Sequence, residues 1–153
     1  MTRILVLQGP NLNMLGTREP EIYGTETLDQ LHTKIGRHAL DLGLDVVSFQ
    51  SNHEGALIDR LHERDFDAVI INAGGLTHTS VSLRDALLAV NRPFVEVHLS
   101  DPSKRDGFRK VNFLADIALE SFVGQGPQGY LLALDLIADR LGQGDRATRK
   151  PER

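Results

Sequence analysis

Asn11, Asn72, His98 and Ser100 are polar residues that come at, or shortly after, the ends of short apolar stretches. These stretches cover residues 4–7, 68–71 and 94–97, the last of which is interrupted by Glu96. Short apolar stretches of this kind are typical of strands buried on both faces of a parallel sheet. Ligands bind where loops leave the carboxyl ends of such strands, so we expect these four side chains around a pocket at one edge. For Asn11 alone, an ordinary turn or capping residue is the alternative.

Glu96 and His98 are two residues apart in the predicted strand 94–98, so their side chains point to the same face of that strand. A carboxylate placed among Phe and Val residues should be buried and must then have a partner. We predict that Glu96 orients the imidazole of His98 and favours its protonated form, which makes His98 a candidate general acid. The alternative is an edge strand with both side chains in water.

Arg18 and Tyr23 lie in a long segment between Gly9 and Gly24 that has no helical spacing. Long loops in compact domains are often functional. A tyrosine hydroxyl has an ordinary pKa of about 10, and a nearby guanidinium can lower it; a shift of three units corresponds to about 4 kcal/mol. Tyr23 is therefore a candidate base, with a packed loop aromatic as the alternative. The segment lacks the glycine spacing of a phosphate-binding loop.

Two further groups of residues could hold a ligand. Asn72 and His78 flank a glycine pair between a strand pattern and a helix pattern, which places both on the rim of the expected pocket. Arg105 and Arg109 lie four apart in a charged segment that follows His98, and two guanidiniums at this spacing could bind a small anion. A solvated charged turn is the alternative for the arginines.

The composition excludes several classes of function. The chain has 153 residues, 41% of them hydrophobic, which predicts one globular domain. It has no cysteine, so disulfides and thiolate chemistry are excluded. A net charge of −4 with scattered basic residues argues against nucleic acid as a partner. No apolar stretch approaches the roughly 20 residues of a membrane span and no signal peptide precedes the first strand, so a cytoplasmic protein is expected. The histidines show no metal-ligand spacing, and no metal is predicted.

Five predicted strands alternate with helices, which indicates an α/β fold with a doubly wound, flavodoxin-like, five-stranded parallel sheet and helices on both faces. We predict capping boxes at Thr27 and at Ser51, each with Gln or Glu three residues later. The last helix is expected from Gln128 to Leu141, ending at Gly142. Residues 1–142 are predicted to form a single catalytic domain, and residues 143–153 a polar, disordered tail.

Five blocks of the chain, in order, resemble the signature sequences of the type II 3-dehydroquinate dehydratases. The blocks are Gly9-Pro10-Asn11-Leu12-Asn13, Arg18-Glu19-Pro20-Glu21-Ile22-Tyr23-Gly24, Gln50-Ser51-Asn52-His53-Glu54-Gly55, Asn72-Ala73-Gly74-Gly75 with Thr77-His78-Thr79-Ser80, and Glu96-Val97-His98-Leu99-Ser100. The resemblance extends from about residue 4 to residue 141. It implies dehydration of 3-dehydroquinate to 3-dehydroshikimate through an enolate, without a cofactor, in the shikimate pathway or in quinate breakdown.

The resemblance also implies roles for individual residues. Tyr23 matches the base, Arg18 the residue that lowers its pKa, and Asn11 the residue that stabilises the enolate. His98 matches the general acid, with Glu96 behind it.

The remaining matches concern the substrate and the assembly. The residues that match substrate-holding groups are Asn72, His78, Leu99, Ser100 and Arg109. Arg105 matches an arginine of a mobile lid. Asp85 resembles an aspartate lent to a neighbouring site, because members of the family assemble as dodecamers built from trimers. Small molecules and other copies of the chain are thus the expected partners, with no nucleic acid and no membrane.

The chain departs from the family pattern in two places. The family usually has Asn and then His after the His-Leu-Ser block, where this chain has Asp101-Pro102-Ser103. After Phe108-Arg109 it usually has His-His-Ser-Tyr, where this chain has Lys110-Val111-Asn112-Phe113. Two other functions remain open at this point. One is a non-catalytic module that binds a small hydroxy acid, and the other is a flavin or nucleotide carrier of flavodoxin type.

Overall fold

Five parallel strands form a single sheet in a computed structural model that describes residues 1–17 and 20–148, with backbone only for residues 22, 23 and 143–148. The strands are β1 (Arg3–Gln8), β2 (Asp45–Gln50), β3 (Ala68–Asn72), β4 (Phe94–His98) and β5 (Glu120–Val123). Their order is β2-β1-β3-β4-β5, and each pair of neighbours is parallel. This is the flavodoxin-like order, so the predicted fold class is confirmed.

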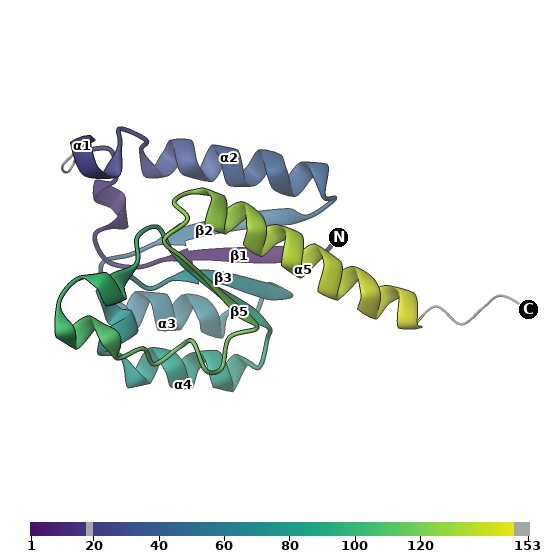
Figure 1. Ribbon diagram of the computed structural model, residues 1–153. Coiled ribbons are helices and arrows are strands. Elements are labelled where there is room, and N and C mark those ends of the chain that lie inside the picture. The colour runs from purple at the N-terminus through teal and green to yellow at the C-terminus, as the bar shows by residue number, and fades with distance from the viewer. Residues whose placement is uncertain (18–19, 149–153) are drawn as a thin grey trace, which may run out of the picture.

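Helices cover both faces of the sheet (Figure 1). α2 (Leu28–Asp41) and α5 (Gln128–Thr148) lie on one face, and α3 (Glu54–His62) and α4 (Val81–Val90) lie on the other. Side chains of β1 alternate between the two layers, as the two-residue period of a strand requires. Ile4 and Val6 pack in the core under α2 and α5, whereas Leu5 and Leu7 pack in the core above α3 and α4. Burial on both faces explains why β1 is apolar throughout its centre.

The carboxyl ends of the strands all lie at one end of the molecule, because the strands are parallel. Gln8 at the end of β1 is in register with Asn72 at the end of β3, and Ile71 is in register with Glu96. The loops at this end carry short helical segments: η1 (Leu12–Met14), α1 (Pro20–Tyr23), η2 (Gly74–His78), η3 (Pro102–Lys104) and η4 (Gly107–Lys110). Figure 1 shows α1 at this end, beside the start of α2.

The predicted capping box of α2 is confirmed, and the one predicted for α3 is wrong. At α2, the Thr27 hydroxyl accepts from the Gln30 backbone and the Gln30 side chain accepts from the Thr27 backbone. At α3, the residue before the helix is His53, whose side chain makes no capping hydrogen bond. The Ser51 hydroxyl instead accepts from the His53 amide at 3.0 Å, because a short serine side chain readily closes a local turn of this kind.

Two segment boundaries also differ from prediction. The segment between β1 and α2 contains η1 and the four-residue α1, where no helix was expected; Pro20 at the first helical position and Glu21 in the first turn both favour helix there. The last helix does not end at Leu141 but continues to Thr148, past Gly142. A glycine costs a helix only about 1 kcal/mol, which does not by itself end it. Residues 149–153 of the predicted disordered tail lie outside the described residues.

None of the described helices is both long enough and apolar enough to span a membrane.

Gly9 joins β1 to the pocket loops, and a side chain there should disturb them. Its amide donates to the carbonyl of Asn72 at 2.8 Å, and a β-carbon on Gly9 would lie 2.5 Å from the carbonyl oxygen of Ala73. We therefore expect Gly9→Ala to lower the free energy of unfolding by about 1–3 kcal/mol, since the β1 and β3 ends must move apart. Urea unfolding measures this change.

Gly55→Ala is the matched control. Gly55 lies in α3, and a β-carbon there would meet nothing within 4 Å. This substitution should leave stability unchanged or raise it by up to about 1 kcal/mol. Equal effects at the two glycines would contradict the steric argument for Gly9.

Candidate active site

A cavity of about 270 Å³ opens at the carboxyl ends of the strands. Polar and basic side chains from the segments that follow β1, β3 and β4 line it, together with a few apolar groups. The lining includes Asn11, Asn72, His78, His98, Leu99, Ser100, Arg105 and Arg109. The predicted convergence of the strand ends at one edge of the sheet is therefore confirmed.

Asn72 is held at the floor of this cavity by hydrogen bonds to both ends of its amide. Its Oδ1 accepts from the Gly74 backbone at 3.2 Å, and its Nδ2 donates to the Tyr130 hydroxyl at 3.0 Å. Tyr130 in turn donates to Oε1 of the fully buried Gln8 at 2.8 Å. These bonds fix which way the Asn72 amide points and leave one of its two N–H groups free to bind a ligand.

The chain of hydrogen bonds continues from Gln8 to α2. Gln8 Nε2 lies 3.4 Å from Nε2 of His32. Burial lowers the pKa of His32, which favours the neutral ring that can accept a hydrogen bond from an amide. Burial also raises the pKa of Tyr130 to about 12, so its hydroxyl keeps its proton. Neither Tyr130 nor Gln8 was predicted as a site residue, although Gln8, like Asn72, is a polar residue directly after an apolar strand.

His78 has a defined orientation on the neighbouring wall. Its Nδ1 lies 2.6 Å from the carbonyl oxygen of Val111. A carbonyl can only accept, so Nδ1 carries a hydrogen and Nε2 of a neutral ring has a free lone pair. The imidazole of His78 can therefore accept a hydrogen bond from a ligand hydroxyl.

Glu96 and His98 lie on the same face of β4, as predicted. Glu96 is completely buried and His98 is 7% exposed, and His98 Nε2 lies 3.0 Å from Glu96 Oε2. The ring N–H is not aligned with that oxygen, so the two atoms are in close contact without an in-line hydrogen bond. The alternative of an edge strand with both side chains in water is excluded.

The buried carboxylate of Glu96 has two further donors. Asn112 Nδ2 donates to Oε1 and Oε2 at 3.1 and 2.9 Å, and the Ser121 hydroxyl donates to Oε1 at 2.8 Å. Burial by itself raises the pKa of Glu96, but the interactions with His98, Ser121 and Asn112 outweigh it and leave this pKa below its ordinary value. Glu96 is thus ionised at neutral pH. Asn112 and Ser121 are distant from Glu96 in sequence. Asn112 lies in the atypical segment 110–113, but no pattern paired it or Ser121 with Glu96.

Asn11 enters the cavity from an unusual backbone conformation. Its φ is 70°, a left-handed conformation that asparagine tolerates better than most residues. Its amide donates to Asn52 Oδ1 at 2.9 Å, and Gln50 Nε2 donates to the same oxygen and to the Gly9 carbonyl, both at 3.2 Å. The loop after β2 therefore supports the loop that carries Asn11.

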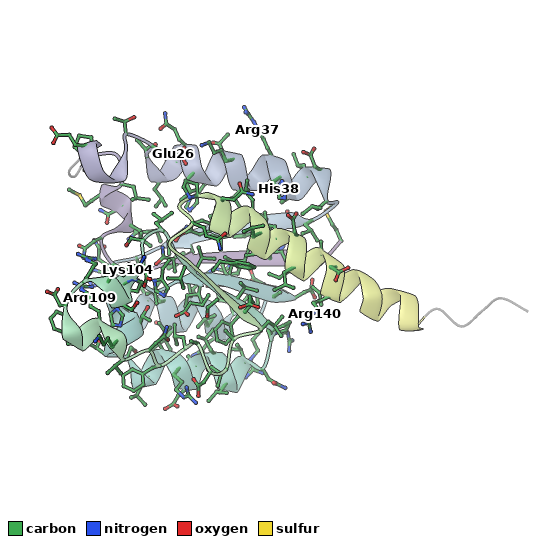
Figure 2. The ribbon with its side chains drawn as sticks, in the orientation of Figure 1. Glu26, Arg37, His38, Lys104, Arg109 and Arg140 are labelled. Carbon is green, nitrogen blue, oxygen red and sulfur yellow. The ribbon has the colours of Figure 1, made fainter. Side chains whose placement is uncertain are left out.

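The basic side of the cavity is formed by η3 and η4. Arg105 and Arg109 both line it, and Figure 2 shows Lys104 and Arg109 close together at this end of the molecule. Arg109 Nε lies 3.3 Å from Asp106 Oδ2, and its guanidinium lies 5.4 Å from the ring centre of Phe108. The arrangement favours an anionic or polyhydroxy ligand.

The atypical Asp101-Pro102-Ser103 segment is an ordered turn. Asp101 Oδ1 accepts from the amide and the hydroxyl of Ser103, at 3.0 and 2.6 Å. These hydrogen bonds hold the pKa of Asp101 below its ordinary value. Although this segment departs from the family pattern, its hydrogen bonds define the turn that leads into η3.

Four predicted site residues do not lie among the described lining side chains, and one of them, Glu96, is buried behind His98. Arg18 lies outside the described residues. The backbone of Tyr23 ends α1, but its side chain is not described, so its role stays a prediction. Asp85 is exposed on α4, on the same side of that helix as the exposed Val81 and Leu88. Among the described side chains, no three or more acidic or histidine groups come together as a metal site would require.

The ionised state of Glu96 should make stability depend on pH. Because its pKa is lowered by folding, the carboxylate stabilises the fold above about pH 4.5, and this stabilisation is lost as the pH falls through the lowered pKa. Glu96→Gln should reduce the free energy of unfolding by about 1–3 kcal/mol at pH 7, because the new amide group faces hydrogen-bond donors. Urea unfolding at a series of pH values measures the difference.

The deficit of Glu96→Gln should shrink as the pH falls below about 4, since the wild-type carboxyl then becomes neutral too. Glu21→Gln, at an exposed position in α1, is the control and should change stability by less than about 0.5 kcal/mol. A deficit that stays constant across the pH range would contradict the assignment.

Comparison with known proteins connects this cavity to a family. The model of the family described as dehydroquinase class II matches residues 2–138. A 3-dehydroquinate dehydratase of Ruegeria pomeroyi is 52% identical over 143 residues, which cover 92% of this chain and 96% of that protein. One of Halothermothrix orenii is 47% identical over 146 residues, which cover 94% and 99%.

Solved structures agree with the sequence comparison. The type II dehydroquinase of Butyrivibrio crossotus superposes with a TM-score of 0.85 at 40% identity, covering 89% of this chain and 97% of that one. That of Propionibacterium acnes gives 0.84 at 36% identity, covering 91% and 97%. The resemblance seen in the signature blocks is confirmed, and the chain belongs to the class II dehydroquinase family.

Proposed function

We propose that this protein is a hydro-lyase that converts 3-dehydroquinate to 3-dehydroshikimate and water. The family and the relatives named 3-dehydroquinate dehydratase support this assignment. The observation in the structure that carries it is the buried Glu96–His98 pair, which opens on a polar cavity. A pocket that only binds a ligand does not need an ionised carboxylate buried behind a histidine.

The reaction is the elimination of water across two adjacent carbons, one of them next to a ketone. In the proposed mechanism Tyr23, kept deprotonated by Arg18, removes the proton from the carbon beside the ketone. The electrons pass into the carbonyl and form an enolate, which Asn11 stabilises. His98 then donates a proton to the departing hydroxyl as the enolate collapses to a conjugated enone. The substrate loses one proton and one hydroxide in total, so the products are the conjugated enone and one molecule of water.

The other cavity residues are proposed to hold the substrate. The free N–H of Asn72 and the free lone pair of His78 suit hydroxyl groups, which both donate and accept. Arg109 is proposed to bind a further hydroxyl. The backbone at Leu99 and the hydroxyl of Ser100 are proposed to take the carboxylate, and Arg105 to cover it from the lid side.

The outer side of α4 supports the proposal that copies of the chain share their sites. Val81, Asp85 and Leu88 are spaced four and three residues apart, so they form one exposed stripe on the helix. An apolar stripe with a carboxylate in the middle suits contact with a second copy. We propose a dodecamer built from trimers, in which Asp85 reaches a neighbouring cavity.

The assay is ultraviolet absorbance, because the enone product is conjugated and the substrate is not. The wild-type protein should produce absorbance with 3-dehydroquinate. Tyr23→Phe should lower kcat by about a thousandfold or more while KM changes by less than about threefold, since it removes the base but little binding surface. Tyr130→Phe is not a suitable control because Tyr130 contacts Asn72. Asp41→Ala, at an exposed position in α2, is the control and should leave kcat and KM unchanged.

Two results would count against this proposal. Near-normal turnover by Tyr23→Phe would refute its role as base. If the wild type binds 3-dehydroquinate but forms no enone, the result would support the alternative of a non-catalytic binding module on the same fold.

The shared site can be tested by combining two impaired variants in one assembly. Asp85→Ala should weaken turnover, and Tyr23→Phe should abolish it. When the two variants are co-expressed, some cavities combine an intact Tyr23 from one subunit with an intact Asp85 from its neighbour. Activity per cavity should then rise several-fold above that of either variant alone.

Asp41→Ala, at an exposed position in α2, is the control for Asp85→Ala and should leave turnover unchanged. Co-expressed assemblies with no more activity than the sum of the separate variants would contradict a shared site.

A further inference from the structure

We propose that Asn112 is a positioning residue for this reaction: it holds the Glu96 carboxylate in place behind His98. The inference rests on the proposed function, in which His98 gives a proton to the leaving hydroxyl. It concerns a segment, residues 110–113, where the chain departs from the family pattern.

The Asn112 amide has one possible orientation. Its Oδ1 accepts from the backbone amides of Leu114 and Ala115, at 2.8 and 2.9 Å. A flipped amide would place an NH₂ group against two N–H donors, which cannot bond to one another. The Nδ2 group is therefore always directed at Glu96 and donates to both of its oxygens.

Asn112 donates a hydrogen bond to the Glu96 oxygen that lies nearest to His98. Ser121 bonds only to Oε1 of Glu96, whereas Oε2 is the atom 3.0 Å from His98 Nε2. Asn112 bonds to this Oε2 at 2.9 Å. Because the ring N–H of His98 is not aligned with Oε2, their contact alone does not fix the carboxylate. The amide of Asn112 supplies the missing constraint.

The same segment also contacts the substrate-holding wall. The carbonyl of Val111 accepts from His78, and the amide of Phe113 donates to the carbonyl of Thr77 at 3.0 Å. Arg109, two residues before Val111, lines the cavity. A single stretch of five residues thus joins the wall that is proposed to hold hydroxyls to the carboxylate behind the acid.

A purely structural role is the competing explanation, because Oδ1 of Asn112 also anchors the turn at Leu114 and Ala115. Asn112→Asp separates the two roles. The new side chain has the same shape and keeps an oxygen for the two backbone amides, so the turn is preserved. Its second oxygen replaces the NH₂ group and faces Glu96 without a hydrogen to donate, unless the two carboxyls share a proton.

Positioning by Asn112 predicts a loss that grows with pH. At about pH 8, where a shared proton is lost, Asn112→Asp should lower kcat about tenfold or more with KM within about threefold of wild type. At about pH 6, where the pair retains a proton, the loss should be several times smaller. A role confined to anchoring the turn predicts no change in the pH profile. The proposal is overturned if kcat of Asn112→Asp stays within about threefold of wild type at both pH values.

Asn112→Ala and Asn91→Asp complete the experiment. Asn112→Ala removes the donor without adding charge, and it should lower kcat at both pH values; wild-type kcat in this variant would also overturn the proposal. Asn91→Asp places the same change of charge at the exposed end of α4, in a left-handed conformation that aspartate tolerates, and should leave the profile unchanged. If the wild type itself forms no enone, the proposed function is contradicted. If the wild type forms enone and the Asn112 variants do so equally well, only the role of Asn112 is contradicted.

Discussion

The buried negative charge of Glu96 is the constraint on which the site depends. A carboxylate without access to water must be surrounded by donors, and these come from three separate parts of the chain: β4 itself, β5 and the segment after η4. Ser121 is the register partner of Glu96 on β5, and Asn112 brings residues 109–113 against the same carboxylate. The same segment then determines the orientation of His78 and the place of Arg109. One electrostatic requirement therefore organises two walls of the cavity.

A second polar network, on the other side of the sheet, serves the binding wall. Gln8, Tyr130 and Asn72 are buried polar groups that satisfy one another, and Tyr130 reaches them from α5, far along the chain. Such networks are costly when incomplete, because each unpaired buried group loses its hydrogen bonds to water. The orientation of Asn72 at the floor of the cavity is thereby fixed by Tyr130 and Gln8, neither of which is among the lining residues.

Local patterns in the sequence were reliable where one interaction decides the outcome. The alternation along residues 94–98 correctly placed Glu96 and His98 on one face, and Thr27 with Gln30 forms the predicted cap. Patterns failed where a residue has several possible partners. Ser51 closes a turn and does not cap α3, and Gly142 does not end α5, since a glycine is tolerated inside a helix.

By itself the sequence determined the order of strands and helices along the chain, the parallel sheet and most of the cavity lining. Strands and helices follow from the local spacing of apolar residues. The cavity lining follows from the topology, because ligands bind at the carboxyl ends of parallel strands. The signature blocks also identified the family. Only the tertiary structure revealed Asn112, Ser121 and Tyr130 as supports of Glu96 and Asn72. These contacts span 16, 25 and 58 residues along the chain. Such pairings depend on how buried polar groups meet in space, and spacing along a single chain does not encode them.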